Sequence, residues 1–383
     1  MLPFRKIQIS TPSVGVDEWN AMKGSIDSGW LTQGPRVREF EKNFASKHDV
    51  EFALATTSCT TALHLMLAAA GIGAGDEVIV PSFTWVSTAN AVLYCGATPI
   101  LCDVDPKTYN IDIDDAVEKI TPNTRAIIAV HLFGLCVDIP KLKSRVRGDI
   151  LIFEDAACAA GAKLNGIFAG NLGDAAAFSF HPRKSITTGE GGMLTTNNSQ
   201  LASIAEQMRN HGAAISEEER HLGAQPYLLP DFNLLGFNYR MTDLQASIGI
   251  IQLNKLDNFI QERDKWAKFY VNELSKITWL SMPLIPPNGG HAWQSFVTRI
   301  DEANAPVPRN LIMEKLQEQG ISTRPGTHAI HLLKYYANKF NYNQAEFPNS
   351  KLCSDTTMAL PLHNRMQEAD YVYIVNALLK IAN

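Results

Sequence analysis

The feature that most constrains the fold is an alternation of short apolar segments with helical patterns between about residues 51 and 196. Segments such as "DEVIVP" and "RAIIAVH" have the length of buried strands, and "TTALHLMLAAAG" has the apolar spacing of a helix. Continuous apolar strands that alternate with helices indicate a mostly parallel sheet covered on both faces. We therefore expect an α/β fold whose ligands bind beyond the carboxyl ends of the strands. The expected strands are 51–55, 76–81, 98–105, 125–131 and 149–155, and the expected helices are 60–71, 84–96, 110–120 and 138–146.

The second half of the chain has a different character. A helix is predicted over 199–212, and a long helix over 241–274 links to a smaller C-terminal domain. In that domain we expect strands at 291–300 and 321–324, and helices at 311–319 and 368–381. The irregular, polar stretch 213–231 is a candidate flexible loop. These patterns divide the chain into a large domain, 1–250, and a linking helix with a small domain, 251–383.

The composition excludes several classes of protein. The net charge of −5 and the pI near 6.1 give no reason to expect nucleic acid or an anionic membrane as partner. The six cysteines contain no CxxC pair and lie mostly in apolar contexts, which favours a reduced, cytoplasmic protein. The ten histidines have no metal-ligand spacing, so no metal is expected.

Lys184 stands in a Gly-flanked crossing, "HPRKSITTGEGG", between the expected strands "AAFSF" and "GGMLTT". Asp155 ends the strand "DILIFED", so adjacent strands are expected to place both side chains over one crevice. A lysine amine attacks carbonyl groups when its site lowers its pKa, and a buried carboxylate that faces a ring nitrogen keeps that nitrogen protonated. This pair is what pyridoxal phosphate (PLP) requires, whereas an isolated lysine is more often a solvated surface residue.

A PLP site also needs a phosphate pocket and a cover for the ring. Ser58, Thr60 and Thr61 lie where the first strand turns into a helix, and helix N-termini bind phosphate. Ser179 adds a hydroxyl close to Lys184, and Trp85 follows the next strand, where it can stack on the ring. Each feature alone is more typical of a helix cap or of core packing, but together they favour a PLP site.

The chain resembles the sugar aminotransferases of the DegT-type family, which are fold-type I PLP enzymes. The resemblance covers nearly the whole chain and rests on motifs in the same order, among them "GWLTQGPRVREFE", "VHLFG", "FEDAACAAGA", "FSFHPRKSITTGEGGM", "GFNYRMTDLQASIG" and "LPLH". It implies a seven-stranded-type sheet flanked by helices, a smaller α+β domain and a homodimer with shared active sites. It also implies amination of a keto group on a nucleotide-linked deoxysugar, with glutamate as donor, in amino sugar and lipopolysaccharide O-antigen biosynthesis.

The resemblance assigns roles to individual residues. It implies that Lys184 is the Schiff-base lysine, that Asp155 faces the pyridinium nitrogen and that Trp85 stacks on the ring. The implied phosphate contacts are Ser58, Thr60, Thr61, Ser179 and, from the partner subunit, Asn238 of "GFNYR". Two departures concern the cofactor: Cys158 replaces the usual Gln near the phenolic oxygen, and Cys59 replaces a common Gly.

A sugar nucleotide also needs cations for its diphosphate. Arg183, Arg240 and Arg324 are candidates, and a surface ion pair is an equally good interpretation of each. "STRPGTHAIH" carries Arg324 together with His328 and His331, which are predicted substrate contacts or structural residues. Thr32 of "GWLTQG" completes the predicted substrate contacts.

Three functions remain open on these residues. The first is a PLP-dependent aminotransferase, and "SFHPRKSITTGEGG" favours a 4-keto-6-deoxyhexose as its substrate. The second is a dehydratase or lyase on the same fold, although the dehydrating branch of the family has histidine in place of Lys184. The third is a PLP-binding sensor without turnover. His181, close to the lysine, is interpreted as structural or as a residue that supports Lys184 without contacting the ligand.

Overall fold

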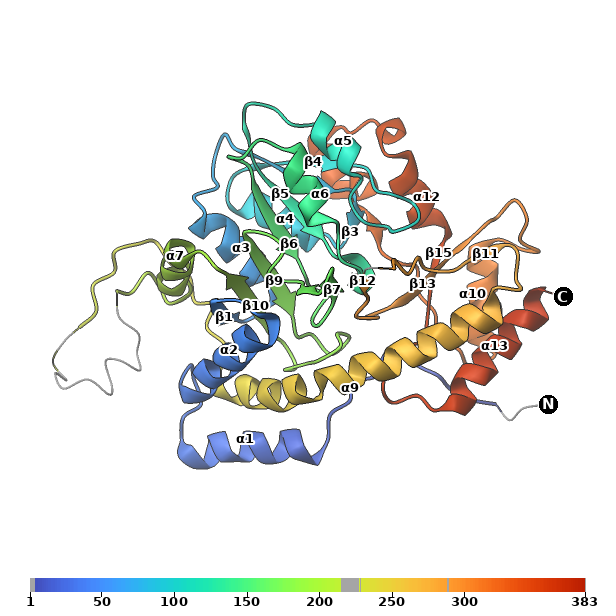
Figure 1. Cartoon of the computed structure of the whole chain (residues 1–383), viewed down its shortest axis with the longest axis horizontal. Helices are drawn as coiled ribbons and strands as arrows, with labels where there is room; N and C mark the ends of the chain where they lie inside the picture. The colour runs from blue at the N-terminus through green and yellow to red at the C-terminus, as the bar shows by residue number, and fades with distance from the viewer. Residues whose placement is uncertain (1–3, 215–226, 228, 288, 383) are drawn as a thin grey trace.

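The computed structural model describes residues 4–214, 227, 229–287 and 289–382. Its centre is a seven-stranded sheet in the order β1-β10-β9-β6-β5-β2-β4 (Figure 1). The strands are β1 (Phe52–Thr56), β2 (Glu77–Pro81), β4 (Thr98–Cys102), β5 (Thr124–Val130), β6 (Leu151–Asp155), β9 (Ala175–Ser179) and β10 (Gly192–Thr196). The predicted mostly parallel, seven-stranded sheet is confirmed.

One strand runs against the others. β10 pairs antiparallel with both β1 and β9, whereas the pairs β9–β6, β6–β5, β5–β2 and β2–β4 are parallel. Residues 180–191 connect β9 directly to β10 without a helix, and a parallel pairing needs a longer crossover. The short connection that reverses the chain is the one that carries Lys184.

Helices cover both faces of the sheet, as expected. Alternate residues of β5 point to opposite sides: Ile127 and Ala129 join one buried cluster, and Ala126 and Ile128 join the other. The first cluster includes residues of α2, α6 and α9, and the second includes residues of α3, α4 and α7. The bounds are α2 (Pro35–His48), α3 (Cys59–Ala69), α4 (Ser87–Tyr94), α5 (Ile113–Glu118), α6 (Ile139–Arg145), α7 (Ser199–Arg209) and α9 (Asp243–Leu274).

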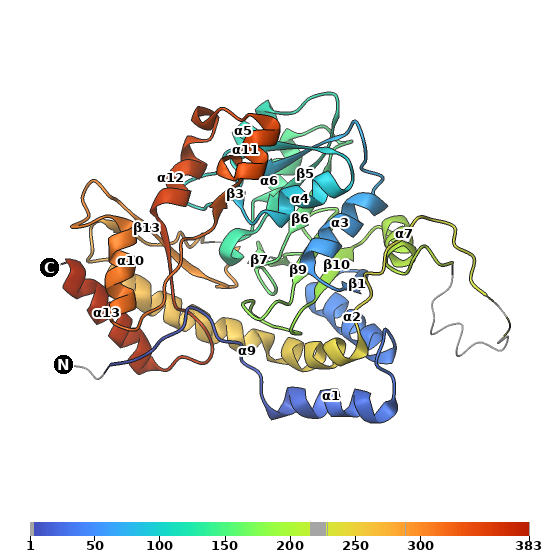
Figure 2. The same cartoon turned by 180° about the vertical axis from the view of Figure 1, so that it is seen from behind.

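The long helix α9 joins the two halves of the molecule, which confirms the helix predicted over 241–274 (Figures 1 and 2). It begins with a capping box in which the Thr242 hydroxyl accepts from the Gln245 amide and the Gln245 side chain accepts in return. Its first turns pack against α2 and against α1 (Val16–Ser28), which the sequence analysis did not predict. Its last turns enter a separate core.

That separate core belongs to the C-terminal part. A three-stranded sheet, β11 (Leu280–Ser281), β13 (Phe296–Ile300) and β15 (Thr357–Leu360), packs with α10 (Arg309–Glu318) and α13 (Glu368–Ala382). The strand predicted over 291–300 begins only at Phe296, because Trp293 has a φ of 49° that interrupts an extended chain. The strand predicted over 321–324 is wrong: this stretch forms only isolated bridges at its two ends. The division at residue 250 stays a prediction.

A short strand pair connects the C-terminal part to the chain that leaves the carboxyl end of β2. In β3 (Phe83–Thr84) and β14 (His328–Ala329), His328 lies opposite Thr84. The remaining elements are β7 (Lys163–Leu164), β8 (Ile167–Phe168), β12 (Gly289–Gly290), α11 (Lys334–Phe340) and α12 (Pro348–Thr356), with 3₁₀ turns at Leu132–Gly134, Ile330–Leu332 and Gln344–Glu346. Most of the predicted flexible loop, 215–226 and 228, lies outside the described residues. Among the helices described, none has the length and apolar character needed to cross a membrane.

Candidate active site

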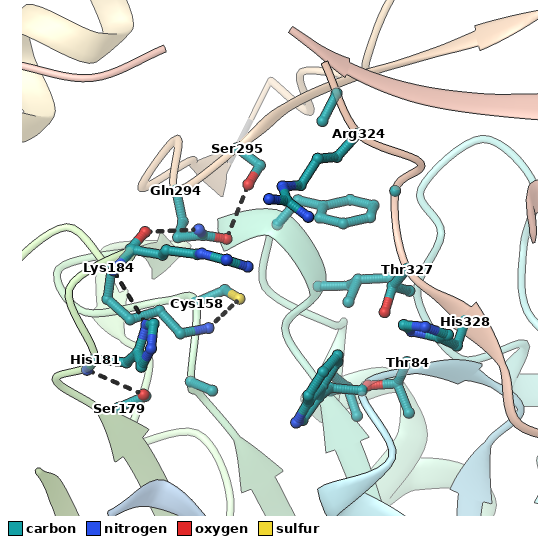
Figure 3. Close-up of a pocket in the computed structure, with 18 of the residues that line it drawn as sticks. Thr84, Cys158, Ser179, His181, Lys184, Gln294, Ser295, Arg324, Thr327 and His328 are labelled. Atoms are coloured by element: carbon teal, nitrogen blue, oxygen red, sulfur yellow. Dashed lines mark hydrogen bonds between the residues drawn. The ribbon is translucent and has the colours of Figure 1, made fainter. Parts of the chain in front are cut away.

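A cavity of about 900 Å³ opens at the carboxyl ends of the central strands. Val130, Asp155 and Ser179, the last residues of β5, β6 and β9, all line it. The opposite wall comes from the C-terminal part and includes Arg324 and His328 (Figure 3). The ligand site predicted beyond the strand ends is therefore a real cavity between the two halves.

Lys184 reaches this cavity from the crossing between β9 and β10. Its backbone amide donates to the His181 carbonyl at 2.8 Å, which closes a turn directly after β9. Its Nζ donates to Cys158 Sγ at 3.2 Å (Figure 3). Desolvation lowers the pKa of Lys184, but Cys158, Cys59 and Asp155 together more than offset it, so the pKa lies above its usual value.

Asp155 lies on the same cavity and is almost fully buried. Its Oδ2 accepts from the Thr88 hydroxyl at 2.7 Å, and its Oδ1 accepts from the Ala157 amide at 3.2 Å. Burial raises the pKa of Asp155, and these donors and Lys184 offset only part of that rise. A buried carboxylate of this kind is suited to pair with a cationic ring nitrogen.

The N-terminus of α3 forms a third wall of the cavity, at Ser58, Cys59 and Thr60. Ser58 caps the helix by accepting from the Thr61 amide at 3.2 Å, and the amides of Cys59 and Thr60 have no acceptor inside the helix. A Cβ on Gly192 would lie 2.4 Å from the Ser58 carbonyl. The glycine therefore lets β10 pass close to this turn, and the turn keeps a shape that suits a phosphate group.

Two arginines line the cavity on different sides: Arg324 lies on the wall opposite Lys184, and Arg183 directly precedes Lys184 in the chain. Trp85 lies against His328 in an edge-to-face arrangement, with ring centroids 5.5 Å apart. Figure 3 shows the Arg324 side chain extending from the C-terminal part toward the middle of the cavity. In the described part of the chain, the guanidinium groups of Arg183 and Arg324 make no hydrogen bond or ion pair. They are available for an anionic ligand.

Comparison with known proteins identifies the family. The model of the DegT/DnrJ/EryC1/StrS aminotransferase family matches residues 12–379. The chain belongs to this family.

Three proteins illustrate the similarity. GDP-perosamine synthase of Caulobacter vibrioides is 38% identical over 99% of both chains. The aminotransferase TlmJ of Streptoalloteichus hindustanus has 30% identity and a TM-score of 0.89, with 98% of each chain covered. The PLP form of Spr1654 from Streptococcus pneumoniae has 26% identity and a TM-score of 0.91, with 99% of each chain covered.

This chain is thus a PLP-dependent aminotransferase, and its own residues fit the cofactor. The cavity places an amine, a buried carboxylate and a helix N-terminus on neighbouring walls. These are the groups that would bind the aldehyde, the ring nitrogen and the phosphate of PLP.

Several residues predicted for the site do not line the cavity of this aminotransferase. Thr32, Asn238 and Arg240 lie elsewhere in their own chain, and the Arg240 side chain donates to the Asn210 side chain at 2.7 Å. The Thr61 hydroxyl donates to the Ser58 carbonyl at 2.8 Å, so it serves the helix cap. Ser58, Thr60, Ser179, Trp85, Cys158 and His328 do line the cavity.

His331 does not support its predicted contact with substrate. The residue is 1% exposed and does not line the cavity, and the centroid of its ring lies 4.7 Å from that of Phe347. Burial lowers the pKa of His331, and neither ring nitrogen has a hydrogen-bond partner among the described residues. His331 lies two residues after β14, in the 3₁₀ turn Ile330–Leu332.

Thr88, which donates to Asp155, and several residues that line the cavity were not predicted from the sequence. Thr88 lies inside α4, and nothing in its local pattern distinguishes it from an ordinary helix residue, although it follows Trp85 by three positions. Gln294 and Ser295 follow Trp293, where the chain was expected to be a strand. Glu190 and His181 also line the cavity, with His181 Nε2 3.9 Å from Glu190 Oε1.

Proposed function

We propose that this aminotransferase converts a nucleotide-linked 4-keto-6-deoxyhexose to its 4-amino sugar, with glutamate as amino donor. The convergence of Lys184, Asp155 and the α3 N-terminus on one large cavity, together with Arg183 and Arg324, which have no side-chain partner in the described residues, carries this proposal. Its volume of about 900 Å³ is at the upper end of small-molecule sites, which suits a sugar nucleotide beside a cofactor. The name of GDP-perosamine synthase, the 38% identical relative, supports a nucleotide-linked amino sugar as the class of product.

The residues around the cofactor have distinct tasks. When bound, PLP supplies an aldehyde that accepts the donor's amino group and a ring that withdraws electrons. Lys184 would hold the aldehyde carbon, and Asp155 would keep a proton on the ring nitrogen. Ser58, Thr60 and Ser179 would contact the phosphate, and Trp85 would cover the ring.

Lys184 also has the right position to move protons. Once the amino donor has replaced it, its amine is free on the wall where the substrate carbon reacts, and it serves as general base. The pKa of Lys184 is raised in this structure rather than lowered, as a nucleophilic lysine would need. Cys158, which contacts Nζ in this structure, would lie beside the cofactor.

The far wall is proposed to bind the sugar nucleotide. Arg324 would neutralise the diphosphate, with Arg183 from the Lys184 side of the cavity as a second cation, because neither guanidinium has a partner in the described residues. His328 is exposed on the same wall and would contact the sugar. This arrangement would hold the ketone within reach of the transferred nitrogen.

We further propose a homodimer with shared sites. The "GFNYR" segment lies beside the α3 turn, since the Thr57 amide donates to the Tyr239 carbonyl at 3.0 Å. Asn238 is exposed and does not line its own cavity, and Phe232 and Leu235 expose large apolar side chains just before it. Exposed apolar groups of this size are typical of an interface. Asn238 and Arg240 would then serve the site of the partner.

Mixing inactive subunits tests the sharing. Lys184→Ala and Asn238→Ala subunits, each inactive alone, should regain activity on subunit exchange, because one site of each hybrid has both residues intact. No recovery, with exchange confirmed by native mass spectrometry, would contradict a shared site.

The substrate is tested with matched nucleotide sugars. The enzyme is incubated with glutamate and either a 3-keto or a 4-keto sugar nucleotide, and the position of the new amine is determined by NMR. Amination at carbon 4 with one oxoglutarate per product supports the proposal. Amination confined to carbon 3 overturns the proposed position of the amine. If the sugar loses water and no oxoglutarate is formed, the result favours the dehydratase alternative.

The cellular location is also a proposal. All six cysteines lie in the described part of the chain and each is a free thiol, which suits a reducing compartment such as the cytoplasm. A role in lipopolysaccharide O-antigen biosynthesis stays a prediction.

A further inference from the structure

Cys158 and Lys184 form a contact pair on the cavity wall. Lys184 Nζ lies 3.2 Å from Cys158 Sγ, and both side chains are half-buried (Figure 3). Both residues line the 900 Å³ cavity, so a small solute can reach the sulfur. A sulfur and an amine at this separation are close enough to react with each other once either is activated.

The other five cysteines have a different environment. Burial raises the pKa of Cys95 to about 11 and the pKa of Cys353 to about 12, and it raises those of Cys59, Cys102 and Cys136 as well. Such thiols stay protonated at neutral pH and react slowly, because the thiolate is the nucleophile. Of the six cysteines, all described, Cys158 is the one whose sulfur contacts a lysine amine. Oxidation is therefore expected to select Cys158.

We propose that Cys158 and Lys184 are a peroxide-sensitive pair that closes reversibly into a covalent sulfur–nitrogen link. In the first step the Cys158 sulfur takes one oxygen atom from hydrogen peroxide. Sulfur loses two electrons to become a sulfenic acid, and the peroxide is reduced to water. In the second step the neutral Lys184 amine attacks the sulfur and displaces hydroxide, which leaves as water with a proton from nitrogen. The product is a sulfenamide that has lost two hydrogen atoms relative to the free pair.

The link would stop turnover and would be reversible. A linked Lys184 has no free amine for the cofactor or for proton transfer. An external thiol attacks the sulfur and releases the lysine as a mixed disulfide forms, and a second thiol releases Cys158. The proposal rests on the proposed function in one respect: an aminotransferase frees Lys184 from the cofactor each time the donor's amino group is taken up. The enzyme is then most sensitive to peroxide while it holds the aminated cofactor.

The test compares three forms of the holoenzyme: loaded with PLP, loaded with pyridoxamine phosphate, and loaded with PLP in the presence of glutamate. Each is treated with hydrogen peroxide, digested, and analysed by mass spectrometry for a peptide containing Cys158 joined to one containing Lys184. We expect the joined peptide, lighter than its two parts by two hydrogen atoms, in the second and third forms and little of it in the first. Activity should fall in step with the link and return with dithiothreitol.

Two variants serve as controls. Cys158→Ser keeps a polar side chain of similar size and should form no link, while Cys95→Ser should behave as the parent enzyme. Absence of the joined peptide from the pyridoxamine phosphate form overturns the proposal, as does equal thiol-reversible inactivation of Cys158→Ser. If the joined peptide is found in the pyridoxamine phosphate form but not in the form treated with PLP and glutamate, the Cys158–Lys184 link is supported. That result would instead contradict glutamate as the amino donor.

Discussion

Thr88 should control the protonation of Asp155, and replacing it by valine tests this. The Thr88 hydroxyl is buried and donates to Asp155 Oδ2 at 2.7 Å, and valine keeps the shape of the side chain without the hydroxyl. A hydrogen bond to a charged group is worth about 1.5–3 kcal/mol. At about 1.4 kcal/mol per pKa unit, its loss should raise the pKa of Asp155 by roughly one to two units above an already raised value.

The consequence is measured on the first half-reaction. A neutral Asp155 no longer stabilises the proton on the ring nitrogen, so the rate with amino donor should fall about tenfold to a hundredfold at neutral pH. The acidic limb of the pH–rate profile should move to higher pH by about one unit or more. Stopped-flow absorbance of the holoenzyme with glutamate, recorded across pH, gives both quantities.

The conservative variant separates this role from packing. Thr88→Ser retains the hydroxyl and should keep the acidic limb close to that of the parent enzyme. The reasoning is refuted if Thr88→Val leaves the acidic limb in place, or if Thr88→Ser shifts it as far as Thr88→Val does.

Three further predictions follow from the same geometry. Gly192→Ala should weaken PLP binding at least about tenfold, at a cost of roughly 1–3 kcal/mol, because its Cβ would lie 2.4 Å from the Ser58 carbonyl. Equilibrium titration with PLP measures the affinity. The control is Gly24→Ala, whose Cβ would have no atom within 4 Å and which should bind PLP normally. Burial lowers the pKa of His48 to about 4, so the folded protein keeps this ring neutral where the unfolded chain would protonate it. The free energy of unfolding should therefore decrease as the pH falls from about 6.5 toward 4, with a loss of about 2 kcal/mol at pH 5. Urea unfolding at pH 7 and pH 5 should show a smaller decrease in the free energy of unfolding for His48→Gln than for the parent enzyme. Asp155→Asn should retain PLP but slow the half-reaction by orders of magnitude, and a near-native rate in single-turnover kinetics would contradict its role.

The large sheet was predictable because each of its strands is a local pattern. β2, β5 and β6 are continuous apolar runs bounded by turns, so their period and length identify them without any tertiary information. The predicted strand over 321–324 failed for the opposite reason. Its residues are held by single bridges to Ile7 and Ala359, which come from distant parts of the chain.

The candidate site was predictable where a residue's place in a strand fixes its direction. Asp155 and Ser179 end two neighbouring strands, and both line the cavity. Thr88 was missed because its contact with Asp155 spans 67 positions and depends on how α4 packs against the sheet. The sequence left His331 open between a substrate contact and a structural residue, because its burial depends on a contact with Phe347 that local sequence does not show.

The central claim is that Lys184 is the residue that binds the cofactor, and one measurement tests it most directly. The purified holoenzyme is reduced with borohydride, digested, and examined by mass spectrometry for a lysine that carries the reduced cofactor. We predict that this lysine is Lys184, whose amine lines the cavity beside Asp155 and the α3 N-terminus, and that Lys184→Ala carries no such adduct there. A cofactor adduct on another lysine of the parent enzyme, or one retained in this cavity by Lys184→Ala, would contradict the account.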